Sequence, residues 1–142
     1  TNFNHSDWCQ ARRKIFSLVK QDLGLFEHLN VKENIFIFNN LKHNVPKYSN
    51  KDIISNLGLD KVLSQKISSL SIGEKQRVAI CRSLVKPFKL LILDEPFSHL
   101  DKKNTQNAIN IIKKILKQRN AAMIMTSHSA CKNFKYKHRV AL

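Results

Sequence analysis

The stretch Leu70–Asp101, LSIGEKQRVAICRSLVKPFKLLILDEPFSHLD, decides the fold of this chain. It begins with Ser71-Ile72-Gly73-Glu74, where a serine followed three residues later by a glutamate predicts a capping box at a helix start. Unpaired backbone N–H groups and the helix dipole make such a start attractive to anions such as phosphate. The apolar pattern continues to Val85, and Pro87 is expected to mark the helix end.

The second part of the stretch is an apolar strand that ends in two carboxylates. The uninterrupted run Leu90–Leu93 is typical of a central parallel strand that is covered on both faces. Asp94 and Glu95 follow it directly, and a carboxylate pair at a strand end suits a divalent metal ion and an activated water molecule. The stretch therefore predicts two phosphate-handling devices that are joined by one helix.

The flanking segments predict an α/β protein. Ile15–Val19 and Ala121–Thr126 are expected to form strands, and Asp101–Arg119 has the apolar spacing of an amphipathic helix. Residues 31–69 predict a small helical region, with Gly58 at a helix C-terminus. This order indicates a parallel sheet flanked by helices, with an inserted helical part.

Together these motifs resemble those of the ATP-binding cassette (ABC) ATPases, most of all the transporter ATPases. Gln76-Arg77-Val78-Ala79-Ile80 is similar to the family's signature helix, and DEPFSHLD (94–101) is similar to its Walker B and D-loop motifs. The family usually has glycine in place of Ile72 and glutamine in place of Glu74. The resemblance implies a partial P-loop NTPase-like α/β fold with an inserted helical subdomain.

The resemblance also implies a division of the chain, in which 1–142 form a single partial ABC ATPase domain. About 25–88 would be the helical subdomain with the signature motif, and 1–24 and 89–142 would belong to the α/β core. Only 48 residues separate Gln21 from Leu70. This leaves no room for the long coiled coil of the chromosome-maintenance ABC ATPases.

The resemblance further implies roles for the residues at the motif positions. Glu95, Gln21 of the Q-loop and His128 of the switch would be catalytic, although a single glutamine or histidine considered alone is more often structural. Asp94, with Gln21, would hold Mg²⁺. The cofactor ATP would be bound by the signature and D-loop residues Ser71, Gly73, Glu74 and Asp101.

The family's Walker A loop, G-x-x-x-x-G-K-[S/T], has no counterpart in this chain. Its three glycines are Gly24, Gly58 and Gly73, and none of them precedes a lysine. The chain is therefore expected to cover the C-terminal two-thirds of a cassette, as a fragment of a longer product or a truncated relative. On its own it is expected to hydrolyse ATP negligibly, because Walker A holds the phosphates.

The favoured function is that of an ATP-binding and ATP-hydrolysing subunit, or a fragment of one, of an ABC transporter. It implies a second ABC ATPase subunit and a transmembrane permease subunit as partners, and a peripheral location on the cytoplasmic face of the cell membrane. Two alternatives stay open. One is a non-catalytic regulatory or binding module, and the other is a soluble non-transport ABC protein that acts on nucleic acid or the ribosome.

Composition narrows these alternatives. The net charge is +15 over 142 residues, which suits nucleic acid or an acidic membrane surface. The lysines are spread along the chain, however, so a solvated basic face is favoured and nucleic acid is not expected as a partner. No apolar run approaches the roughly 18 residues that would span a bilayer. Three scattered cysteines without a CxxC pair fit a reducing cytosol.

Overall fold

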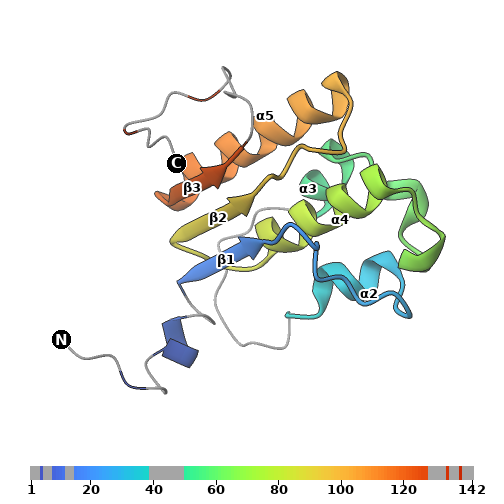
Figure 1. Ribbon diagram of the computed structural model, residues 1–142, viewed down its shortest axis with the longest axis horizontal. Coiled ribbons are helices and arrows are strands. Elements are labelled where there is room, and N and C mark those ends of the chain that lie inside the picture. The colour runs from blue at the N-terminus through green and yellow to red at the C-terminus, as the bar shows by residue number, and fades with distance from the viewer. Residues whose placement is uncertain are drawn as a thin grey trace.

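The computed structural model describes residues 4, 8–11, 15–38, 50–127, 134 and 138, and every structural statement refers to these. The order of elements confirms the predicted α/β pattern (Figure 1). In chain order they are β1 (Phe16–Val19), α2 (Val31–Phe36), α3 (Asn50–Asn56), the 3₁₀ turns η1 (Asp60–Val62) and η2 (Ile67–Ser69), α4 (Ile72–Val85), β2 (Leu90–Asp94), α5 (Lys102–Arg119) and β3 (Ala122–Thr126).

The three strands form a parallel sheet in the order β1-β2-β3, so that β2 is central. In the register of the strands, Leu18, Ile92 and Ile124 lie side by side, and Asp94 lies beside Thr126. Parallel strands end at the same edge of a sheet. The polar residues that close β1, β2 and β3 are therefore gathered at one edge.

The two faces of the sheet are covered unequally. Leu91 and Leu93 are completely buried and belong to the same core cluster as apolar residues of α4 and α5. On the opposite face Leu18 is 47% exposed and Ile124 is 55% exposed. Between these two residues Ile92 of β2 is partly buried. In the described residues, β2 is therefore fully buried on the side of α4 and α5 and only partly covered on the other side.

The helix α4 packs against α2, α3, α5 and β1. Its N-cap is Ser71, its C-cap is Lys86, and its apolar side is buried in the core. Two arginines of α4 and its C-cap lysine donate hydrogen bonds to backbone carbonyls of neighbouring segments. Arg77 donates to Leu57 and Gly58, Arg82 donates to Leu23 and Gly24, and Lys86 donates to Phe16.

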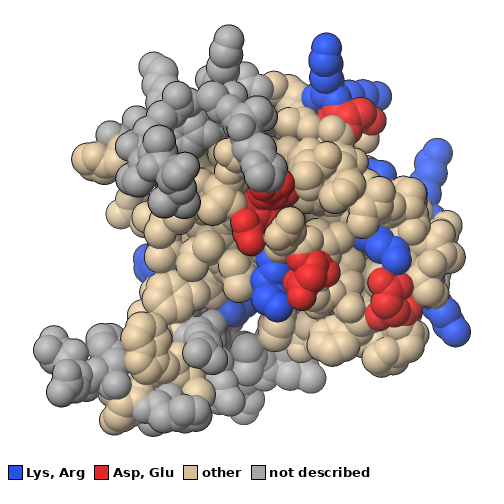
Figure 2. Space-filling model, in the orientation of Figure 1, with Lys and Arg blue, Asp and Glu red and all other residues tan. Residues whose placement is uncertain are grey.

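Charges on the face that Figure 2 shows are mixed. Among the described residues, acidic side chains lie between the lysines and arginines there, so that these cations form no continuous patch in this view. In the described residues, no helix combines the length and the apolar character that a membrane span requires.

Candidate functional site

A cavity at the carboxyl edge of the sheet brings together two of the predicted metal ligands. Its volume is about 560 Å³, and Gln21 and Asp94 both line it, together with Leu18, Lys20 and Asp22. Asp94 is the last residue of β2, and Gln21 opens the turn that follows β1. The parallel pairing of β1 with β2 places the two residues at this edge.

Thr126 joins this edge from the third strand. Its Oγ1 donates a hydrogen bond of 2.6 Å to Oδ1 of Asp94 and accepts one of 3.2 Å from the backbone N–H of Glu95. The sequence analysis gave no role to this residue. Strand register identifies Thr126, because the last residue of a neighbouring parallel strand must lie beside Asp94.

The oxygen chemistry of this edge fits Mg²⁺. A carboxylate from Asp94 and an amide oxygen from Gln21 are hard ligands, and Mg²⁺ is usually held by one or two carboxylates while keeping several waters. Among the described residues no group of three or more His, Cys, Asp or Glu side chains forms a metal cluster. The donor set thus matches a lightly coordinated magnesium ion rather than a caged metal.

Glu95 has a left-handed backbone conformation, with φ of 45°. Its carbonyl oxygen accepts hydrogen bonds from Nε2 of Gln76 at 3.0 Å and from Oγ of Ser98 at 3.2 Å. Gln76 belongs to α4, so the signature helix is bonded directly to the turn that follows the Walker B strand. The predicted catalytic residue His128 lies outside the described residues.

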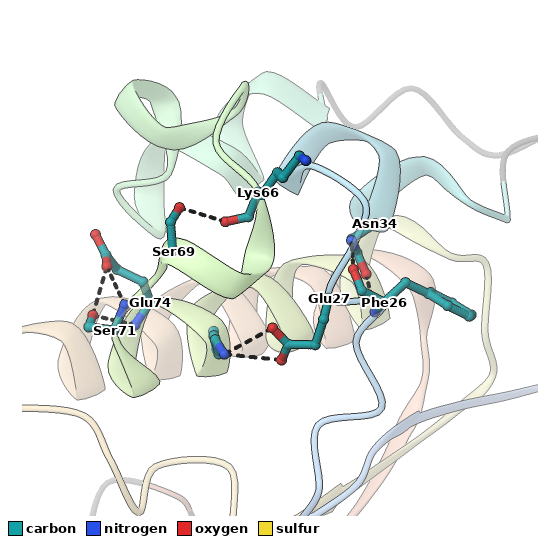
Figure 3. A network of polar contacts seen from close by, with 8 residues as sticks. Phe26, Glu27, Asn34, Lys66, Ser69, Ser71 and Glu74 are labelled. Atoms are coloured by element: carbon teal, nitrogen blue, oxygen red, sulfur yellow. Dashed lines mark hydrogen bonds and ion pairs between the residues drawn. The ribbon is translucent and has the colours of Figure 1, made fainter.

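The start of α4 has the predicted capping box (Figure 3). Oε2 of Glu74 accepts hydrogen bonds from the backbone N–H of Ser71 at 2.9 Å and from its hydroxyl at 2.7 Å. These two bonds hold the pKa of Glu74 below its ordinary value of 4.5. The Ser71 hydroxyl therefore faces Glu74, and it must turn away before it donates to a phosphate.

Glu74 is expected to make the stability of the chain sensitive to acid. Its folded pKa is lowered, so its contribution is present above the unfolded pKa and is lost as the pH falls through the folded pKa. In Glu74→Gln the amide oxygen still accepts from Ser71. The variant should match the wild type within about 0.5 kcal/mol at pH 7 and lose less stability in acid. Thermal unfolding between pH 7 and pH 2 measures this, and parallel acid losses in both proteins would contradict it.

The signature and D-loop residues meet in a second cavity. Its volume is about 260 Å³. It is lined by the four predicted nucleotide-binding residues Ser71, Gly73, Glu74 and Asp101, and also by Arg77, His99, Leu100 and Asn104. Asp101 is the N-cap of α5 and accepts a hydrogen bond of 2.7 Å from the backbone N–H of Asn104. That bond lowers the pKa of Asp101.

Gly73 is required by the packing of this second cavity. A Cβ atom at position 73 would lie 2.9 Å from the backbone carbonyl oxygen of His99, which is closer than real Cβ atoms approach. The D-loop thus lies directly against the first turn of the signature helix. The structure places the predicted metal ligands in one cavity and the predicted nucleotide-binding residues in another.

Known proteins resemble this chain in sequence. A family model described as ABC transporter matches residues 1–98. The chain is 36% identical, over 120 residues, to the thiamine import ATP-binding protein ThiQ of Salmonella typhimurium, covering 82% of this chain and 51% of that protein. It is 42% identical, over 94 residues, to the lipoprotein-releasing system ATP-binding protein LolD of Rickettsia conorii, covering 62% and 42%. The chain spans about half the length of these relatives.

Solved structures share the fold. The dimeric ATP-binding cassette MJ0796 in a post-hydrolysis state, bound to ADP and Pi, superimposes with a TM-score of 0.77. The match has 21% sequence identity and covers 90% of this chain and 58% of that one. An RNase-L inhibitor structure matches with a TM-score of 0.64 and 21% identity, over 78% of this chain and 21% of that one.

Proposed function

The chain belongs to the ABC transporter family, and we propose that it is the signature and Walker B portion of the ATP-binding subunit of an ABC transporter. The observation that carries the proposal is the separation of the predicted residues into two cavities. Gln21 and Asp94 line one, and Ser71, Gly73 and Asp101 line the other. Two separate sites on one chain suit a dimer, in which each chain supplies different parts of each nucleotide site.

The first cavity would serve the nucleotide of the same cassette. Phosphoryl transfer requires neutralised charge and a positioned water more than covalent chemistry. Glu95 orients or deprotonates the attacking water, and the amide of Gln21 and the imidazole of His128 help to position it. Asp94 and Gln21 would hold Mg²⁺, which would supply charge neutralisation for the phosphates. A cassette-type Walker A loop would complete this site.

The second cavity would serve the nucleotide of the partner subunit. It lies at the start of α4, a helix of 14 residues, whose first N–H groups and positive dipole end attract phosphate oxygens. The backbone N–H of Gly73 and the hydroxyl of Ser71 are the donors. Glu74 stays in its capping box, which keeps its carboxylate directed at Ser71, and Asp101 reaches across the dimer interface.

Exposed apolar surfaces support larger assemblies. The open face of the sheet carries Leu18 and Ile124, and parallel sheets are normally covered on both faces, so a further layer of the cassette would lie there. In the helical region Phe26 is 43% exposed and Phe38 is 40% exposed. We assign this second surface to a transmembrane permease subunit, which places the chain at the cytoplasmic face of the membrane. The relatives named for thiamine import and lipoprotein release support a role in transport.

A non-catalytic regulatory module is the second candidate function. The observation in its favour is the sequence itself, which contains no G-x-x-x-x-G-K-[S/T] motif. Such a module would bind an intact cassette or permease without turning over ATP.

ATP turnover tests the proposed function. The purified chain should show no Mg²⁺-dependent hydrolysis above the buffer rate, because nothing in its sequence replaces the Walker A lysine and glycines. A chimera that joins the preceding part of the ThiQ relative to this chain should hydrolyse ATP.

The matched control is the same chimera with Glu95→Gln, which keeps the size of the side chain and removes its basicity. Its turnover should fall by roughly a hundredfold or more. Turnover by the chain alone, or a chimera that is indifferent to Glu95→Gln, would overturn the proposal. A folded chimera without turnover would favour the regulatory module.

A further inference from the structure

Gln76 is a buried polar side chain whose bonds all lead to one turn. It is 1% exposed, and its Nε2 donates to the carbonyl of Glu95 at 3.0 Å. Its Oε1 accepts from the backbone N–H of His99 at 3.3 Å and lies 3.0 Å from Nδ1 of the same residue. One amide of α4 therefore spans the turn from Glu95 to His99.

The side chain of His99 also contacts Gln76. Nδ1 of His99 lies within hydrogen-bonding distance of Oε1 of Gln76, in addition to the bond that the His99 backbone N–H donates to the same oxygen. The same Nδ1 lies 2.9 Å from Oγ of Ser98, which donates in turn to the Glu95 carbonyl. His99, where the family commonly has a small residue, is thus part of the network that holds this turn.

Thr126 bonds to the backbone N–H of Glu95, whereas Gln76 bonds to its carbonyl. Thr126 accepts the Glu95 N–H and donates to Asp94, so the backbone donor of Glu95 is bonded to β3 and its backbone acceptor is bonded to α4. Gln76 and Thr126 lie 50 positions apart in the sequence, and they bond to the carbonyl and to the N–H of Glu95, respectively.

The hydrogen bonds that Gln76 and Thr126 make to the backbone of Glu95 explain its conformation. A left-handed backbone at a non-glycine residue is unfavourable, because Cβ crowds the neighbouring carbonyl. Such a conformation persists only where the surroundings over-determine it. The φ of 45° at Glu95 sets the direction in which its side chain leaves the backbone. Losing either partner releases the turn toward ordinary backbone geometry.

We propose that Gln76 and Thr126 are positioning residues that lock Glu95 in its left-handed conformation and thereby direct its carboxylate at the reacting phosphate. The proposal rests on the proposed role of Glu95 in ATP hydrolysis. Gln76 acts from the signature helix, so it also ties the site of the partner's nucleotide to the catalytic carboxylate of its own chain.

Nuclear magnetic resonance of the isotope-labelled chain tests the proposal. The coupling between the Glu95 amide and Hα, with the Cα and Cβ shifts, reports the sign of φ at this residue alone. Gln76→Met keeps the length of the side chain and removes both polar groups. Thr126→Val keeps the shape and removes Oγ1, and Thr126→Ser restores the oxygen. Gln118→Met, on the exposed face of α5, is the matched control for Gln76→Met.

We expect Glu95 to lose its left-handed signature in Gln76→Met and Thr126→Val, and to keep it in Thr126→Ser and Gln118→Met. In Gln76→Met the exchange rate of the His99 amide should rise roughly fivefold to tenfold, because that amide loses its acceptor. Resonances of α5 should stay in place, which separates a local release from general unfolding.

A left-handed Glu95 that survives both Gln76→Met and Thr126→Val would overturn the proposal. If Gln76→Met does not fold, the contrast between Thr126→Val and Thr126→Ser decides. These measurements need no nucleotide. A chimera without ATPase activity would therefore leave the backbone result unchanged, and failure of the proposed function is distinguishable from failure of this inference.

Discussion

Replacing Arg82 by methionine is expected to lower the free energy of unfolding by about 3 kcal/mol, because two hydrogen bonds from a partly buried cation are lost. Nη1 of Arg82 donates to the carbonyl of Gly24 at 2.9 Å, and Nη2 donates to that of Leu23 at 2.8 Å. The Arg82 side chain is partly buried, and this burial lowers the pKa of its guanidinium. Its partner carbonyls would be left without these donors.

The turn to which Arg82 donates these hydrogen bonds has an unfavourable backbone conformation. Leu23 and Gly24 both have positive φ, at 60° and 54°, and a leucine in that region is strained. Gln21 belongs to the same turn, over residues 21–24. Loss of Arg82 should therefore release the turn, and urea unfolding followed by circular dichroism measures the cost.

Lys75→Met is the matched control, since it removes another cation from the same helix. Nζ of Lys75 pairs with Glu27 at 3.0 Å (Figure 3), but the Glu27 side chain is 58% exposed. Surface ion pairs contribute about 0–1 kcal/mol. Equal losses in Arg82→Met and Lys75→Met would contradict the interpretation that Arg82 acts through the carbonyls of Leu23 and Gly24.

The sequence predicted the elements whose signals are local. The capping box of Ser71 and Glu74 needs only one helical turn, and it forms as expected. The strand Leu90–Asp94 and the helix Lys102–Arg119 follow from apolar spacing. The family resemblance placed Gln21 and Asp94 on one Mg²⁺ ion, and both residues line one cavity.

Features that depend on distant contacts escaped prediction. Gln76 and Thr126 reach Glu95 from elements remote in sequence, and no periodicity marks such partners. The positive φ of Glu95 has no local signature either, because glutamate is not a residue that favours this region. The exposed face of the sheet was not predicted, for another reason. An apolar run indicates that a strand is buried but does not identify what covers each face.

Replacing Leu93 by alanine is expected to cost about 3–4 kcal/mol of unfolding free energy, because it leaves a cavity in a closed part of the core. Leu93 is completely buried and comes directly before Asp94. Its side chain belongs to the cluster that α4 and α5 form over one face of the sheet. Guanidinium unfolding at equilibrium measures the loss, and a cost below about 2 kcal/mol would contradict close packing at this site.

Leu18→Ala removes the same atoms from the other face of the same sheet. Leu18 pairs in register with Ile92 and is 47% exposed, so its truncation should cost about 1 kcal/mol or less, since little area returns to water. Unequal costs of the two leucine variants would show that one face is open in this chain. In the chimera with the ThiQ segment, the cost of Leu18→Ala should rise toward that of Leu93→Ala, because a second layer would then cover Leu18. A cost that stays low in an active chimera would mean that the added segment completes the nucleotide site without covering this face.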